Sequence, residues 1–284
     1  ELKLNKKMIT LKIDIKNNIF IVDSTTIDLC LSIYPWAKFR KAKAAIKLHT
    51  KMDAKTSIPD FIHISDGKMH DVNALDLLYY ETGGYYILDR GYIDYERLFK
   101  IHKSNAYFVI RAKDNLQFRR MYSNKVNKDN GVLLDQEGKL TGFYVSRGYP
   151  EKLRRIRFYD EETDKTLEFL TNNFDLKAEE IAQLYKYRWK VELFFKWIKQ
   201  HLKIKSFWGR SQNAVKIQVY SAIIAYCLVA LGRDKLKVYY SIYEILQILS
   251  ISLLAKTPLN ELLTNQNYKD VKELYSKQLK INWI

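Results

Sequence analysis

The sequence has little cysteine and no stretch that resembles a leader, and both absences limit where the protein works. Cys30 and Cys227 are the only cysteines, and they lie far apart without the spacing of metal ligands. Neither a disulfide framework nor a structural zinc site is therefore indicated, and a reducing, cytoplasmic setting is expected. No charged-then-apolar segment opens the chain. Its first residue is Glu1 rather than Met, which fits a fragment whose natural start lies upstream.

Long apolar runs, internal repeats and low-complexity tracts are also lacking. The longest apolar run, residues 222–231, is interrupted by Tyr226 and Cys227. It is far shorter than the roughly 20 residues that a membrane-spanning helix needs. We expect a buried helix there and no membrane segment.

Acidic residues are scarce relative to basic ones. The chain has 48 Lys and Arg against 32 Asp and Glu, a net charge of +16. This balance points to a polyanionic partner, most often nucleic acid, although ribosomal and membrane-surface proteins share it. A hydrophobic content of 47% with 14% aromatics excludes a disordered basic tail. At 284 residues the chain can bury a large core, in one main domain with an insertion or a small second domain.

Residues 1–112 have the pattern of a mixed sheet with helices on its faces. Strands are expected at 18–23, 44–53, 59–67, 85–89 and 106–112, and helices at 71–80 and 95–102. Two of the strands end on an acid, at Asp23 in NIFIVD and at Asp89 in YYILDRGY. Three strands, helix, strand, helix, strand is the order of a ribonuclease-H-like domain with a five-stranded sheet.

Residues 113–170 change in character and predict a β-rich insertion. The segment is rich in Asn, Gly and charge, with short alternating pieces such as GFYVSRG and RRIRFYD. Its basic residues fit a solvated strand face and a DNA-contacting face equally well. They are Arg147, Lys152, Arg154, Arg155 and Arg157.

Residues 171–284 predict the second part of the core followed by a helical C-terminal part. A long helix is expected over 176–202, then helices at 214–231 and 238–249, and two shorter ones after Pro258. Between Ile181 and Arg210 there are eight Lys or Arg and a single acid, Glu192.

The long helix carries one polar stripe on an otherwise apolar rod. At 100° per residue, five polar residues fall within roughly 60 to 80° of one another. They are Tyr185, Arg188, Glu192, Lys196 and Lys199. The other faces carry residues such as Leu184, Val191 and Phe194. A lone carboxylate among cations on a mostly buried helix suggests an acid that binds metal and cations that bind phosphate.

Asp23, Asp89 and Glu192 together suit two-metal phosphoryl transfer. Mg²⁺ and Mn²⁺ prefer oxygen ligands, and two ions about 3.5–4 Å apart stabilise both the attacking and the leaving oxygen. Each of the three acids lies where apolar periodicity predicts a partly buried position. The histidines at 49, 63 and 70 are not expected as ligands, because hard Mg²⁺ does not favour imidazole.

The glutamate block resembles that of a known family. Tyr185-x2-Arg188-x3-Glu192-x6-Lys199 is similar to the Y-R-E-K pattern of the insertion-sequence-4 type of DDE transposases. LTNNF before this block and SQNA after it also match. VDSTT and LDRGY resemble the family's two aspartate blocks, and KLHTKMD and the His70-Asp71 pair resemble the segments between them.

The resemblance implies a fold, an activity and a set of site residues. The fold is a ribonuclease-H-like core with a β-rich insertion between the second aspartate and the glutamate. Asp23, Asp89 and Glu192 would bind two Mg²⁺ (or Mn²⁺) ions for cut-and-paste excision and strand transfer of an insertion sequence. The residues that would hold DNA are Tyr185, Arg188, Trp189, Lys196 and Lys199.

The resemblance also implies partners. These are double-stranded DNA, as terminal repeats and target, and a second copy of the chain in the DNA complex. A bacterial cytoplasmic, nucleoid-associated location follows. Family members commonly carry a DNA-binding region before the core, which is not found here, as expected of a start at Glu1 that is not native.

Simpler interpretations stay open for each residue. The two aspartates fit strand-end turns or helix caps, Glu192 fits an i,i+4 salt bridge to Arg188 or Lys196, and the aromatic residues of the block fit core packing. Two other functions also remain: a ribonuclease-H-fold DNA nuclease without strand transfer, and a non-catalytic DNA-binding protein derived from a transposase.

Overall fold

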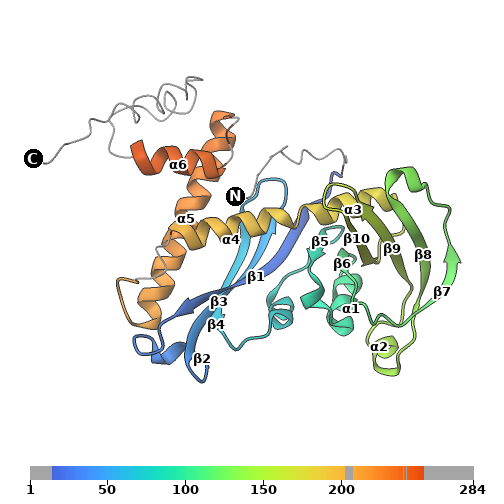
Figure 1. Ribbon diagram of the computed structural model, residues 1–284, viewed down its shortest axis with the longest axis horizontal. Helices are drawn as coiled ribbons and strands as arrows, with labels where there is room; N and C mark the ends of the chain where they lie inside the picture. Colours follow the sequence, from blue (N-terminus) through green and yellow to red (C-terminus); the bar gives the residue numbers. More distant parts are fainter. Residues whose placement is uncertain (1–14, 202–206, 239, 241, 253–284) are drawn as a thin grey trace, which may run out of the picture. The chain divides into compact units, whose positions relative to one another are not determined.

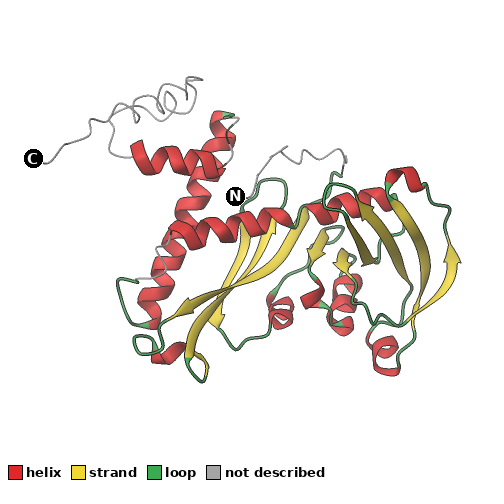
Figure 2. Ribbon diagram, in the orientation of Figure 1, coloured by secondary structure: helices red, strands yellow, loops and turns green. Residues whose placement is uncertain are grey.

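The computed structural model describes residues 15–201, 207–238, 240 and 242–252. The chain divides into two compact units, Glu1–Val219 and Tyr220–Ile284. The first unit contains the sheet and the helices that pack on it (Figure 1). Figure 2 shows that the strands all belong to this unit and that the described part of the second unit is helical.

The first part of the sheet has the order expected of a ribonuclease-H-like core. β1 (Ile19–Leu29), β3 (Lys43–Asp53) and β4 (Pro59–Asp66) form an antiparallel meander. β5 (Tyr85–Leu88) and β6 (Tyr107–Arg111) then run parallel to β1. The order β4-β3-β1-β5-β6 confirms the predicted fold class. A short β2 (Lys38–Arg40) pairs with the start of β3.

The sheet does not end at β6, so the expectation of five strands is wrong in extent. β10 (Lys165–Thr171) pairs antiparallel with β6, with Phe169 opposite Arg111. β9 (Leu153–Asp160), β8 (Val132–Leu140) and β7 (Phe118–Ser123) follow in turn. The result is one ten-stranded sheet, because β10 satisfies the backbone hydrogen bonds that an edge strand β6 would leave open.

Alternation along the strands gives the central sheet two different faces. Phe20, Val22, Tyr86 and Leu88 belong to a core cluster on one face. The elements covering that face include η2 (Asp71–Leu77), η3 (Arg90–Tyr92), α1 (Tyr95–Lys103) and α2 (Phe143–Gly148).

The opposite face is covered by α3 (Ala178–Lys186) and α4 (Trp189–His201). α3 packs on β5 and β6 and α4 packs on β1, as Figure 1 shows. The odd-numbered residues of β1 therefore point toward these helices.

The expected long helix over 176–202 is split in two. α3 ends at Lys186 and α4 begins at Trp189. Between them the N–H groups of Tyr187, Arg188 and Lys190 donate to carbonyls three residues earlier, at 3.1, 3.0 and 2.9 Å. This tightened turn changes the phase of the polar stripe. No Gly or Pro marks it in the sequence, so the helical pattern continues through the break.

Two shorter elements also differ from expectation. The α-helix expected over 71–80 is the shorter 3₁₀ helix η2, and Asp71 does not cap it, because its carboxylate binds Ser24 and Lys47. GFYVSRG was expected as a strand piece but forms α2. Its aromatic residues Phe143 and Tyr144 are exposed, so no alternating buried face holds it in a sheet.

The helical C-terminal part contains α5 (Gln212–Leu236) and α6 (Ile242–Ser252) among the described residues. The expectation of a buried helix over 222–231 holds only for one side: Ile223, Tyr226 and Ala230 are buried, but Ile224, Leu228 and Leu231 are 58%, 64% and 55% exposed. Apolar side chains lie all around α5, and the described elements cover only part of them. By length and composition alone α5 could cross a membrane, a criterion that core helices also meet. The helices expected after Pro258 lie outside the described residues.

Candidate active site

The register of two parallel strands places the two aspartates side by side. Val22 on β1 pairs with Leu88 on β5, the last pair of that ladder. Asp23 directly follows Val22 and Asp89 directly follows Leu88, and neighbouring strands lie about 4.8 Å apart. Asp23 is not at a strand end as expected, because β1 continues to Leu29. It lies instead at the point where β5 stops.

Arg188 joins the first aspartate to the glutamate. Its guanidinium lies 2.5 Å from Oε1 of Glu192, at the i,i+4 spacing, and 3.6 Å from Oδ2 of Asp23. Thus the salt bridge expected as the simpler interpretation of Glu192 is present. The same arginine reaches the strand as well, so the ion pair does not remove Glu192 from the aspartates.

The pKa of Asp23 is shifted by burial and by several neighbouring charges. Its pKa is raised from 3.8 to about 6, mainly by burial and also by the neighbouring charges of Asp89 and Glu192. The N–H of Ser24, which donates to Oδ1 at 2.8 Å, and the charge of Arg188 act in the opposite direction. Three acids therefore interact at one place on the sheet, with one guanidinium to offset them.

Tyr185 holds the second aspartate from α3. Its hydroxyl donates to Oδ1 of Asp89 at 3.2 Å, and its ring packs against Phe169 with centroids 4.8 Å apart. Burial raises the pKa of Tyr185, and the charge of Arg111 at the end of β6 acts against that rise. Tyr185 is only 7% exposed, and its hydrogen bond places it to orient the carboxylate of Asp89.

Two buried asparagines set the position of α3. The side chain of Asn172 accepts from the N–H of Phe108 and donates to the carbonyl of Ala106, both at 2.9 Å. Asn173 accepts from the N–H groups of Asp175 and Leu176 just before α3. The sequence supplied these residues only as part of the LTNNF resemblance. The structure gives them a physical role: they fix the start of the helix that carries Tyr185.

The remaining residues of the stripe point outward. Lys196 and Lys199 are exposed on α4, and neither forms an ion pair with another described residue. Trp189 is 48% exposed, so core packing does not account for it. The stripe is thus divided: Tyr185 and Arg188 contact the carboxylates, Glu192 is one of these carboxylates, and the two lysines face solvent.

The oxygen ligands suit a hard divalent ion, although they do not form a closed cage. Within the part of the chain that the structure describes, no three acidic, histidine or cysteine side chains are grouped as a ready metal site. Arg188 supplies between Asp23 and Glu192 the positive charge that a metal would otherwise bring. The donor set therefore fits Mg²⁺ or Mn²⁺ once that guanidinium gives way.

A second polar group lies on the other face of β1 and was not predicted. Ser24 Oγ donates to Oδ1 of Asp71 at 2.5 Å, and Lys47 Nζ lies 3.0 Å from the same oxygen. His49 contacts Ser65 at 3.0 Å, and burial lowers its pKa to about 4, so it is neutral. These contacts fix the strand next to Asp23. In the sequence, the polar residues Ser24, Thr25 and Thr26 that follow Asp23 could have indicated this second cluster.

The arginines of the insertion are largely paired within the protein. Arg154 is buried and binds both oxygens of Asp135 at 2.8 Å. Arg155 and Arg157 both bind Glu168, at 2.8 and 2.9 Å. The expected alternatives were a solvated strand face and a DNA-contacting face, whereas these three arginines pair with acids of the protein itself.

Comparison with known proteins identifies the family. The transposase DDE domain family matches residues 15–228. The chain belongs to this family. Its relatives include the "Putative transposase y4zB" of Sinorhizobium fredii, 35% identical over 75% of this chain and 60% of that protein. The "Probable transposase for insertion sequence element IS5377" of Geobacillus stearothermophilus is 31% identical over 76% of this chain and 57% of that protein. The resemblance to insertion-sequence transposases is confirmed.

Two facts define the scope of these comparisons. The chain spans about three fifths of the length of the curated relatives it matches. A solved structure of the piggyBac transposase synaptic complex with hairpin DNA is similar over 94% of this chain and 58% of that one, with a TM-score of 0.46 and 10% sequence identity.

Proposed function

We propose that this DDE-family protein is a DNA transposase that excises an insertion sequence and joins it to target DNA by two-metal phosphoryl transfer. One observation carries the proposal. The β1–β5 register sets Asp23 beside Asp89, and Arg188 links Asp23 to Glu192 on the helix above. The charges of three acids from distant parts of the sequence thus act on one another, which supports a shared role in the reaction.

Asp23, Asp89 and Glu192 would hold two Mg²⁺ or Mn²⁺ ions. Bound there, the ions supply charge stabilisation for the attacking and leaving oxygens of a phosphodiester. Tyr185 keeps the carboxylate of Asp89 oriented through its hydrogen bond. Arg188 balances the acids until the ions and DNA are present, and then pairs with a phosphate.

The DNA partner would be held by the exposed residues of α4. Lys196 and Lys199 are free to contact backbone phosphates, which position DNA without reading sequence. Trp189 can stack on a sugar or base. The proposed substrates are the element's terminal repeats and target DNA, bound by a homodimer in the bacterial cytoplasm, close to the nucleoid.

Glu192→Gln tests the mechanism. The variant keeps the shape and hydrogen bonding of the side chain but loses the charged ligand, so it should bind DNA and lose all Mg²⁺-dependent cleavage. Glu179→Gln on α3 is the matched control, because Glu179 lies in a first helical turn away from the aspartates. Retained cleavage by Glu192→Gln would contradict the proposal.

The products of the reaction separate a transposase from a nuclease of the same fold. In an assay with supercoiled plasmid and a matched terminal-repeat oligonucleotide, a transposase gives joined or hairpinned products. A nuclease gives only nicked and linear DNA. A non-catalytic DNA-binding protein gives neither, and the presence of all three acids argues against that outcome.

A further inference from the structure

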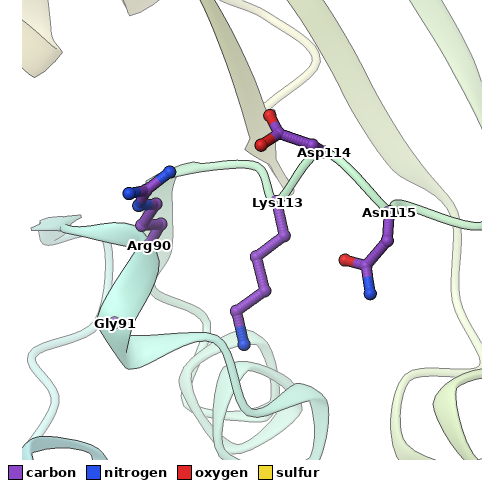
Figure 3. A pocket seen from close by; sticks show the side chains of 5 residues that line it. All are labelled: Arg90, Gly91, Lys113, Asp114 and Asn115. Atoms are coloured by element: carbon purple, nitrogen blue, oxygen red, sulfur yellow. The ribbon is translucent and has the colours of Figure 1, made fainter.

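A hollow lies at the carboxyl ends of β5 and β6, next to the candidate active site. It is lined by Arg90, Gly91, Lys113, Asp114 and Asn115, with a volume of about 430 Å³ (Figure 3). Arg90 and Gly91 follow directly after Asp89, and the other three follow β6. In open α/β sheets, ligands bind outside the carboxyl ends of parallel strands. The volume is within the roughly 300–1,000 Å³ of small-ligand sites.

The charges in the hollow favour an anion. Arg90 and Lys113 are both exposed, and neither forms an ion pair with a described residue. In Figure 3, Lys113 and Asn115 extend to one side of the hollow, whereas the guanidinium of Arg90 and the carboxylate of Asp114 point to the other. Two cations and an amide donor thus line the hollow, while the one acid in the segment is turned from the lysine.

The backbone at Gly91 leaves the hollow open. A Cβ atom at this position would meet no other atom within 4 Å, so the absence of a side chain here is not forced by packing. Gly91 is not among the residues with positive φ, so its conformation does not require glycine either. What glycine does provide is space for a ligand to approach the backbone beside Asp89.

We propose that this hollow binds the phosphate backbone of the DNA strand that enters the active site, through the exposed cations Arg90 and Lys113 that line it. The proposal rests on the proposed transposase function and adds a DNA contact that the Y-R-E-K helix does not supply. It places one contact on the β5–β6 side of the acids, across from α4. The strand would then be held on both sides of the scissile bond.

Salt-dependent DNA binding tests the charge of the hollow. The probe is a short fluorescein-labelled duplex of mixed sequence, measured by anisotropy without divalent metal. The slope of log K against log[salt] counts neutralised phosphates, at about 0.9 per phosphate. The double variant Arg90→Ala/Lys113→Ala should flatten the slope by about 0.9. Lys103→Ala is the matched control. Lys103 is an exposed cation at the end of α1, just before the amino end of β6, whereas the hollow lies at the carboxyl ends of β5 and β6.

Filling the hollow tests its shape. Gly91→Leu should weaken binding by roughly tenfold, the order of one lost charge-assisted hydrogen bond, with little change in thermal stability. Gly91→Ala should bind nearly as wild type does. The proposal is overturned if the double variant and Lys103→Ala have the same slope, or if Gly91→Leu binds like wild type. If either of these results is found while Glu192→Gln still abolishes cleavage, only the proposal about the hollow is contradicted, and the proposed function stands. A wild-type protein that binds no duplex removes both proposals.

Discussion

Acidic residues in two regions of the same sheet are treated in opposite ways. In the β8–β10 region, Asp135 is buried against a guanidinium that binds both its oxygens, and Glu168 is bound by two arginines. Burial alone would raise the pKa of Glu168, but hydrogen bonds from Arg155 and Arg157 hold it below its usual range. At the β1–β5 junction, Asp23 shares one arginine with Glu192, and its pKa is raised to about 6.

The difference separates acids that support the fold from acids available for chemistry. Fully paired carboxylates have no remaining capacity for a metal. Under-compensated carboxylates raise the free energy of the metal-free protein and are relieved when cations bind. Four experiments test this contrast, in order of expected effect.

The largest effect is expected from breaking the paired region. Arg154→Met leaves Asp135 buried without its partner, and the free energy of unfolding should fall by about 3–5 kcal/mol. Urea denaturation measures the loss. Arg157→Met is the control, because Arg157 is 42% exposed and its pair should contribute less than about 1 kcal/mol. Equal losses would show that burial of the pair does not matter.

At the junction, removing an acid should stabilise the protein. The pKa of Asp23 is raised on folding from 3.8 to about 6, so its ionisation opposes folding. The contribution of Asp23 to the free energy of unfolding is fully present below about pH 4. It is lost as the pH rises through about 6, where the folded-state carboxyl ionises. Asp23→Asn should therefore gain up to about 3 kcal/mol over wild type at pH 8 in EDTA.

This gain should vanish below pH 4, where the wild-type carboxyl is protonated in both states. Unfolding at a series of pH values gives the difference directly. The groups that face Asp23 are Arg188, Asp89 and Glu192, and none of them changes in the variant. A variant that is less stable than wild type at pH 8 would contradict an under-compensated junction.

The arginine of the junction should compete with metal. Arg188→Gln removes the cation between Asp23 and Glu192, so the affinity for Mg²⁺ should rise roughly tenfold, equivalent to about 1.4 kcal/mol of removed repulsion. Calorimetric titration without DNA measures this. Arg155→Gln, in the paired region, is the control. Unchanged or weaker metal binding would mean that Arg188 does not occupy the charge position of the ions.

The smallest effect concerns cations outside both clusters. Lys196→Ala and Lys199→Ala should each reduce the salt slope of DNA binding by about 0.9, because each lysine would neutralise one phosphate. Stability should stay near wild type, since both side chains are exposed. A lysine whose removal leaves the slope unchanged is not a phosphate contact.

Much of the core could be predicted because its strands are apolar runs bounded by polar turns. The pattern identified β1, β3, β5 and β6, and it placed both aspartates next to a strand. It could not show that Asp23 lies in mid-strand, because the residues Ser24 to Leu29 alternate too little to signal continuation. The pairing of Val22 with Leu88, which brings the acids together, is a long-range property of the sheet.

Other features depend on contacts that no local pattern contains. The break at Tyr187 arises without Gly or Pro, and it separates Tyr185, which donates to Asp89, from the exposed Lys196 and Lys199. The arginines of the insertion were indistinguishable from DNA contacts until Asp135 and Glu168 were seen opposite them. The sequence pattern marked Arg111 only as a strand residue, but in the structure its charge acts on the hydroxyl of Tyr185.

The parity of β1 has a consequence for how this protein can evolve. Successive residues of a strand face opposite sides, so gaining or losing one residue between Ile19 and Asp23 would turn the aspartate into the apolar cluster of Phe20 and Val22. Exchanges among Ile, Val and Phe would keep the side-chain directions. The segment should thus tolerate many apolar substitutions but no single-residue insertion or deletion. Its length should therefore vary less during evolution than its amino-acid sequence.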